Sequence, residues 1–219
     1  MAKVQGMKEK LHWPLYDAFV VPESKETPPP TFASEMQRRD SRVLRFFVDV
    51  QSKTKLETNL QASGALPSMN SYEVRALRVV VSPLLRKKER EPTGGREAKE
   101  PHTHITDNIL ADLIYNSVTS LLVGEKTMIE MPTYFFPSGA GVSPGTQSLP
   151  SHGEPDPTAT FRFSEPVMIE PNQNFRVELQ FPQGIPTSEK SNGVVRLGDA
   201  TGPMRLWVVL DGYLTRDVQ

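Results

Sequence analysis

The clearest pattern in the chain is a strict alternation of apolar and polar residues between Phe175 and Phe181. Because neighbouring side chains of a β-strand point to opposite faces of a sheet, this period of two predicts a strand with one buried face. A second run, Met204 to Leu210, is mostly apolar and predicts a more central strand. We expect the core face to contain Phe175, Val177, Leu179, Phe181, Leu206, Val208 and Leu210.

Further strands are indicated by β-branched and aromatic runs that end at turn residues. Asp211-Gly212 predicts a bulge or bend in the last strand. One stretch, residues 107–122, carries apolar side chains at helical spacing and predicts a helix across one end or face of a sheet. The other predicted strands are 42–50, 71–81, 126–136 (broken at Pro132), 161–169 (interrupted at Pro166) and 194–197.

Residues 1–40 have the character of an extended arm. Their prolines, including Pro28-Pro29-Pro30, prevent a helix or a central strand, yet the segment is rich in apolar side chains that need cover. These side chains pack either on the chain's own domain or in grooves of a neighbouring subunit. The second arrangement predicts that a chain without residues 1–30 still folds but assembles poorly. The candidate subunit contacts are Trp13, Leu15, Tyr16, Phe19 and Val20.

Composition excludes several classes of function. The formal net charge of -1 gives no overall attraction for nucleic acid or anionic membranes, and no specific nucleic-acid motif is present. The absence of cysteine excludes disulfides, thiolate nucleophiles and cysteine metal sites. No apolar run approaches the roughly 20 residues of a membrane span, and the first residues lack the apolar core of a secretion signal. We therefore expect a soluble protein, made in a cytoplasm, with no membrane span.

Candidate catalytic chemistry is sparse. Glu100, His102 and His104, with Asp107 nearby, resemble part of a metal site, but a third histidine, His152, belongs to another loop. We interpret this cluster as a polar loop. No nucleophile elbow and no phosphate-binding loop is present. The sequence predicts no catalytic residue, no cofactor and no metal site, and hence a protein that is not an enzyme.

The expected layout is an arm at 1–40, a first strand at 42–50, a helix at 107–122 and a last strand at 204–214. This layout resembles the single jelly-roll virion proteins of icosahedral, tailless bacteriophages. The resemblance implies an all-β, antiparallel β-sandwich of jelly-roll type, with one inserted helix and an extended N-terminal arm. It divides the chain into the arm, residues 1–40, and one sandwich domain, residues 41–219.

The same resemblance implies a function. The chain would be a capsid-type structural subunit that is synthesised in a host cytoplasm and located in the virion, with copies of itself and other virion proteins as partners. Two alternatives stay open. A ligand- or glycan-binding sandwich, such as a spike or a lectin-like module, would suit the long loop at 137–157 and exposed aromatic residues. A cupin-like metalloenzyme would need the histidine cluster at 100–107 as its metal site.

Overall fold

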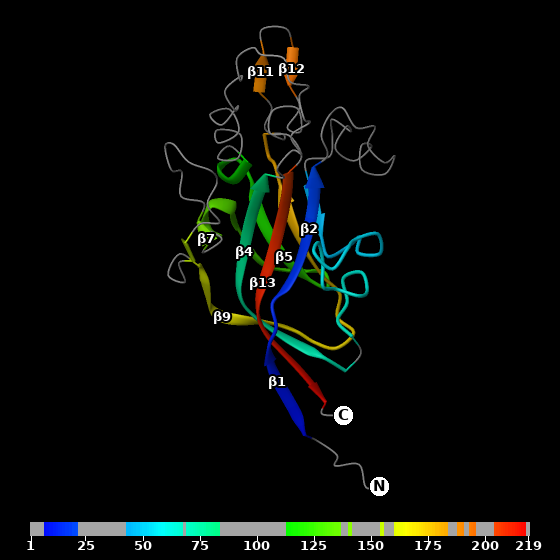
Figure 1. The fold of residues 1–219 in the computed structure, drawn as a ribbon. Coiled ribbons are helices and arrows are strands. Elements are labelled where there is room, and N and C mark those ends of the chain that lie inside the picture. Colours follow the sequence, from blue (N-terminus) through cyan, green and yellow to red (C-terminus); the bar gives the residue numbers. More distant parts are fainter. Residues whose placement is uncertain are drawn as a thin grey trace.

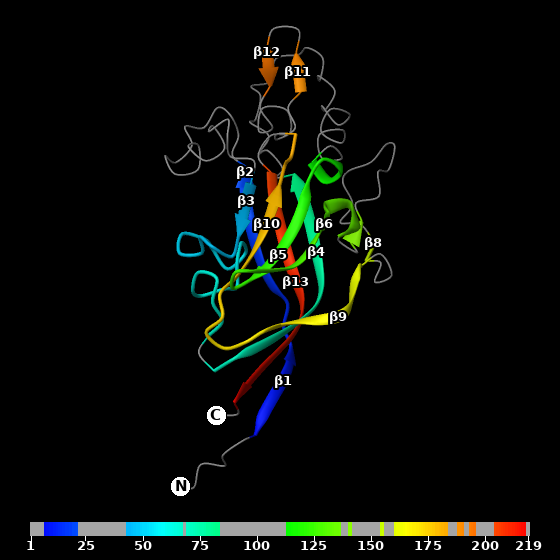
Figure 2. The ribbon, with the colours of Figure 1, turned by 180° about the vertical axis from the view of Figure 1, so that it is seen from behind.

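The chain folds as an antiparallel β-sandwich, which the computed structural model shows from two sides in Figures 1 and 2. Two sheets pack face to face, and helical structure is almost absent from the described residues. The predicted all-β sandwich is therefore confirmed. The structure describes residues 7–21, 43–67, 69–83, 113–136, 140–141, 154–155, 160–183, 188–190, 193–195 and 204–217.

The strands are distributed over two main sheets and two short hairpins. The first sheet contains β1 (Lys8–His12), β2 (Leu15–Val21), β4 (Ser71–Pro83), β9 (Arg162–Ile169) and β13 (Met204–Asp217). The second contains β3 (Val43–Phe46), β5 (Val118–Val123), β6 (Lys126–Pro132) and β10 (Phe175–Gln180), and the turn η1 (Thr133–Phe135) follows β6. The hairpins pair β7 (Ala140–Gly141) with β8 (Glu154–Pro155) and β11 (Ser188–Lys190) with β12 (Gly193–Val195).

The last strand, β13, is the centre of the first sheet. The strand order is β1-β13-β4-β9, and β2 also pairs with β13, on the same side as β1. The second sheet has the order β3-β10-β5-β6, so β10 is central there. The two runs with the clearest hydrophobic pattern, β10 and β13, are thus interior strands with a neighbour on each side.

The N-terminal segment is an edge strand of the chain's own sheet. The register of β1 and β2 on β13 is continuous, from Lys8 opposite Asp217 to Val21 opposite Met204. At the joint between them, the Trp13 N–H donates to the Gly212 carbonyl oxygen over 3.1 Å. Residues 8–21 are therefore paired within the chain's own sheet, the first of the two arrangements considered for this segment, while residues 1–6 and 22–42 lie outside the described part of the chain.

The predicted bulge at Asp211-Gly212 is confirmed by a shift in the pairing of β13 with β4. A Cβ atom on Gly212 would lie 2.0 Å from the Glu73 carbonyl oxygen, so only glycine fits there. The buried Tyr72 hydroxyl lies 2.7 Å from the Leu210 carbonyl oxygen and 2.8 Å from that of Trp13. The single hydroxyl hydrogen of Tyr72 is shared between these two carbonyl oxygens. The hydroxyl thus links the N-terminal edge strand to β13 beside the bulge.

The predicted core face is confirmed, because all seven of its residues are buried between the sheets. They pack with large aromatic side chains from other strands into one continuous cluster. Burial of this apolar surface is the main favourable contribution to folding. The largest fully buried aromatic residues are Tyr72, Phe46, Phe47, Phe136 and Phe181.

The predicted helix at 107–122 is wrong over its second half. Residues 113–115 are helical, but Val118–Val123 forms strand β5, which pairs with both β10 and β6. The apolar residues of β5 fit the spacing of a helix and also that of a strand that is buried on both faces. Hydrogen bonding of this segment to the central strand β10 favours the strand. Residues 107–112 lie outside the described part. No described helix is long and apolar enough to cross a membrane.

Replacing Leu179 by alanine is expected to lower the free energy of unfolding by about 3 kcal/mol, because it empties a fully buried position on the central strand β10. Gln180→Ala, at the next and partly exposed position, is the control and should change it by less than about 0.5 kcal/mol. Urea denaturation of both variants measures the difference. Equal stability would contradict the inward face assigned to β10.

Candidate functional site

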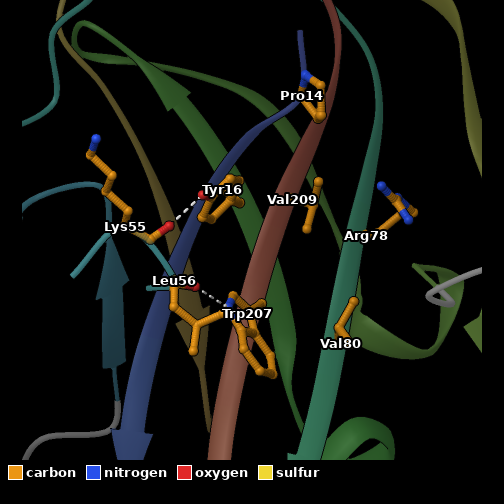
Figure 3. Close-up of a pocket in the computed structure, with 8 residues that line it drawn as sticks. All are labelled: Pro14, Tyr16, Lys55, Leu56, Arg78, Val80, Trp207 and Val209. Carbon is orange, nitrogen blue, oxygen red and sulfur yellow. Dashed lines mark hydrogen bonds between the residues drawn. The ribbon is translucent and has the colours of Figure 1, made fainter. Parts of the chain in front are cut away.

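A shallow groove lies on the outer face of the first sheet, over β2, β13 and β4 (Figure 3). It forms because alternate residues of β13 point inward, which leaves Trp207 and Val209 on the outside beside Val80 of β4. The segment that carries Lys55 and Leu56 forms one side. The groove has a volume of about 440 Å³, and its lining is Pro14, Tyr16, Lys55, Leu56, Arg78, Val80, Trp207 and Val209.

The indole of Trp207, the hydroxyl of Tyr16 and the guanidinium of Arg78 already have partners within the chain. The Trp207 Nε1–H donates to the Leu56 carbonyl oxygen over 3.2 Å, and the Tyr16 hydroxyl donates to that of Lys55 over 2.5 Å (Figure 3). The Arg78 guanidinium lies 2.6 Å from a carboxylate oxygen of Asp211. The lining contains no carboxylate and no imidazole, so it offers apolar contact area rather than acid–base chemistry.

The segment of residues 51–60, which we call the strap, lies along the free edge of β2. The Asn59 side chain accepts the Tyr16 N–H over 3.0 Å and donates to the Pro14 carbonyl oxygen over 2.8 Å. The Thr58 hydroxyl donates to the Tyr16 carbonyl oxygen over 3.1 Å. These bonds replace the main-chain partners that an edge strand lacks, so the strap closes this part of the sheet edge.

A buried ion pair holds the start of the strap. The carboxylate of Asp17, which is fully buried, accepts hydrogen bonds from the Lys53 ammonium over 2.7 and 2.9 Å and from the Phe47 N–H over 2.7 Å. Burial raises the pKa of Asp17 above its ordinary value, although Lys53 and the Phe47 N–H act in the opposite direction. Because no surface of Asp17 reaches solvent, we assign it a structural role rather than a catalytic one.

A second surface feature is an aromatic cluster beside η1. Tyr115 lies 6.2 Å from Tyr134, which stacks on Phe135 at 4.7 Å between ring centroids. Tyr115 is 69% exposed and Tyr134 49% exposed, so this end of the cluster faces solvent. Edge-to-face contacts between phenylalanine rings extend the cluster inward toward the core. The members are Tyr115, Tyr134, Phe135, Phe136, Phe161 and Phe163.

Three buried hydroxyl groups fix the base of the aromatic cluster. The Thr133 hydroxyl lies 2.7 Å from that of Ser117 and 2.8 Å from that of Thr119, and Ser117 also donates to the Leu113 carbonyl oxygen over 2.6 Å. The hydrogen bonds of these three hydroxyls join them to one another and to the backbone, not to an acid or a base. The arrangement ties the helical turn at 113–115 to η1 and is structural rather than nucleophilic.

The predicted contact residues fall into two groups. Leu15 is 4% exposed and Phe19 8% exposed, since both point from β2 into the chain's own core. They are therefore unavailable to a neighbour while β2 is paired with β13. Trp13 is exposed, Tyr16 lines the groove, and Val20 is partly exposed on the same outer face. Contact of these three residues with a neighbouring subunit stays a prediction.

The residues considered for a metal site, Glu100, His102, His104, Asp107 and His152, lie outside the described part of the chain. Within the described part, no three His, Asp or Glu side chains come together as metal ligands would.

Sequence reasoning missed the aromatic cluster, although a signal was present. Thr133-Tyr-Phe-Phe136 follows Pro132 and does not alternate. Three aromatic residues in a row cannot share one face of a strand, so part of the run has to leave the sheet and carry rings to the surface.

Comparisons with models of protein families, with curated proteins and with solved structures find no match for this chain.

Proposed function

We propose that this chain is a jelly-roll structural subunit, of the kind that assembles into a symmetric virion shell. In this proposal it has no enzymatic activity, is made in a host cytoplasm and is located in the virion, with copies of itself and other virion proteins as partners.

The observation that carries the proposal is the nesting of the strand pairs. With β1 taken as the start of β2, eight strands follow one another as β2, β3, β4, β5, β6, β9, β10 and β13. The first pairs with the eighth, the second with the seventh, the third with the sixth and the fourth with the fifth. This nesting is that of one long hairpin of strand pairs. When the hairpin wraps around itself, strands that were not paired along it become neighbours, which gives the pairs β4–β13 and β5–β10.

This order divides the eight strands into two sheets of four, which supports the jelly-roll assignment. Jelly rolls occur in viral capsid proteins, lectins and cupins. A metal site between the sheets would need an open interior, whereas here the described interior is filled by Tyr72, Phe46, Phe181 and their neighbours. Glycan recognition needs hydrogen-bonding groups that are not already bonded, and in the groove Trp207, Tyr16 and Arg78 already have partners. The structural role therefore accounts best for the described surfaces.

Exposed aromatic side chains supply surfaces on which such subunits can meet. Tyr, Trp and Phe are enriched in protein interfaces because they bury a large area with little loss of side-chain freedom. The exposed end of the aromatic cluster and the groove around Trp207 lie on different parts of the sandwich. Two separate contact surfaces allow each subunit to touch more than one neighbour, as a closed symmetric shell requires.

Purified protein tests the proposal directly. Negative-stain images, together with light scattering across a concentration series, should show closed particles of uniform size. A chain that stays monomeric at every concentration and in every buffer that favours assembly would overturn the structural role. Binding on a glycan array by that monomer would favour the spike or lectin-like alternative, and stoichiometric metal bound by it would favour the cupin-like one.

The double variant Tyr115→Ser/Tyr134→Ser is expected to assemble less well than the wild type while its thermal unfolding changes little, since both rings are already largely exposed. The matched control is Met168→Ser, which removes an exposed apolar side chain of β9. Light scattering measures assembly, and calorimetry measures stability. Unchanged assembly of the double variant would remove the aromatic cluster from the proposed contacts.

A further inference from the structure

We infer that the open edge of β1 binds an extended acidic strand of a partner protein, which adds to the first sheet next to Lys8–His12. The inference goes beyond the shell proposal and does not depend on it, because it is carried by one strand edge and its charges.

The main-chain groups of three β1 residues face away from the sheet. The Trp13 N–H bonds to β13, whereas the Tyr16 N–H bonds to the strap on the opposite side. Since strand backbone groups alternate in direction, even-numbered residues of this continuous strand face outward. Lys8, Lys10 and His12 thus present their N–H and C=O groups at the edge, and in the described part of the chain no main-chain group pairs with them there.

The place of β1 in the fold leaves this edge accessible. Figures 1 and 2 both show β1 and the end of β13 projecting from one end of the sandwich. A strand that pairs with a neighbour on one side only is a template for a further strand. Main-chain hydrogen bonds of this kind supply the affinity when a peptide adds to a sheet.

The other edge strands of the two main sheets each have a feature that hinders the addition of a further strand. The strap covers the start of β2, where it bonds to Pro14 and Tyr16. Strand β9 contains Pro166, and its pairing with β4 shifts between Val74 and Ala76. Strand β6 pairs irregularly with β5 and ends at Pro132. Strand β3 has only 4 residues, after which Phe47 takes a φ of 68°. Proline and bulges are usual protections of an edge, and β1 contains no proline and pairs with β13 without a shift in register.

The charged side chains of β1 hinder pairing with an arbitrary strand, and they favour a partner strand of opposite charge. Lys8, Lys10 and His12 share one face of the strand and are exposed. On the side of β13, Lys10 pairs with Glu73, its Nζ lies 4.9 Å from the centre of the Tyr213 ring, and Lys8 lies opposite Asp217. A strand with acidic side chains at every second position would place them opposite these residues. Opposite charges across a strand pair are stabilising.

A second copy of this chain is a poor partner for the same edge. A twofold axis that pairs β1 with β1 sets a residue opposite itself. Centred on Lys10, the axis opposes two lysines, and centred on Glu9 it opposes two glutamates. Like charges that face each other directly across strands are destabilising. In these two registers self-pairing is opposed by like charges, whereas an acidic strand would place carboxylates opposite the lysines, so repulsion contributes to the choice of partner.

A short peptide tests the inference. The probe is the acidic peptide acetyl-Thr-Glu-Val-Glu-Val-Glu-Thr-amide, with the same peptide carrying lysine for glutamate as the matched control. Each is titrated into isotopically labelled full-length protein, and amide shifts are followed by NMR. We expect the Lys8, Lys10 and His12 amides to move, with the acidic peptide binding roughly tenfold or more tightly than the lysine peptide. The difference should shrink at high salt.

Two variants of one residue separate main-chain pairing from charge. Lys10→Gln removes the charge and keeps the outward N–H, so it should weaken binding moderately. Lys10→Pro removes that N–H without removing a bond to β13, and it should weaken binding further. Equal affinity for the two peptides would overturn the inference, as would equal binding by the two variants. Shifts of the β1 amides with protein concentration in the absence of peptide would assign the edge to a second copy and overturn it too.

Discussion

A chain that begins at Glu23 is expected not to fold. The truncation removes β1 and β2, and with them two large side chains of the core, Leu15 and Phe19. Burial of such side chains contributes about 1.5–3 kcal/mol each, and uncovering their partners on β13 adds a similar loss. Because a domain is typically stable by only about 5–15 kcal/mol, this loss removes most or all of the folding free energy.

Circular dichroism and gel filtration of the truncated protein measure the result. A chain that begins at Met7 keeps both strands and is the control, with a thermal midpoint close to that of the full chain. A folded monomer from the shorter chain would contradict the place of β2 in the chain's own sheet. It would restore the view that residues 1–40 form an arm whose side chains belong on a neighbour.

Replacing Lys53 by methionine is expected to lower the free energy of unfolding by about 4 kcal/mol near neutral pH, because it leaves the buried Asp17 carboxylate without its cation. Burial already raises the pKa of Asp17, and loss of Lys53 raises that pKa further. A raised pKa means that the folded state binds the Asp17 proton more tightly than the unfolded chain does. The folded state is therefore favoured in acid, and it loses this stability as pH rises through the folded-state pKa. The variant should therefore lose less stability in mildly acidic buffer than near neutrality.

Denaturant titrations at two pH values measure this dependence. Lys55→Met, which removes an exposed lysine of the same strap, is the matched control and should change stability by less than about 0.5 kcal/mol. Adding Asp17→Asn to Lys53→Met removes the buried charge and should recover part of the loss. A cost for Lys53→Met that does not vary with pH would show that the ion pair does not hold the strap as described.

Strands with an unambiguous period of two could be predicted from the sequence, and so could their inward faces. The N-terminal strand was harder, because proline marks both a free arm and an edge strand. Pro14 lies between β1 and β2, and it is tolerated there because its nitrogen faces away from β13. The sequence does not show this direction, since it follows from how the strands pair. Asp17 presents the same difficulty: it interrupts an apolar run, and its partner Lys53 is remote in sequence.

The candidate surfaces could be predicted only in part. The exposed Trp13 and the groove residue Tyr16 belong to the segment that the sequence marked for contacts. The remaining groove residues come from β4, β13 and the strap, and their meeting depends on a sheet order that local patterns do not contain. The same holds for the aromatic cluster, whose rings come from three separate segments.

The nested strand order also governs when the protein can fold. Strand β13 is the common partner of β1, β2 and β4, yet it is synthesised after every other described strand. The apolar faces of β2 and β4 therefore stay uncovered until β13 has left the ribosome. Pairing between segments so distant in sequence is slow, and uncovered strands aggregate while they wait. We expect the nascent chain to depend on chaperones, and its folding rate to be limited by the docking of its final strand.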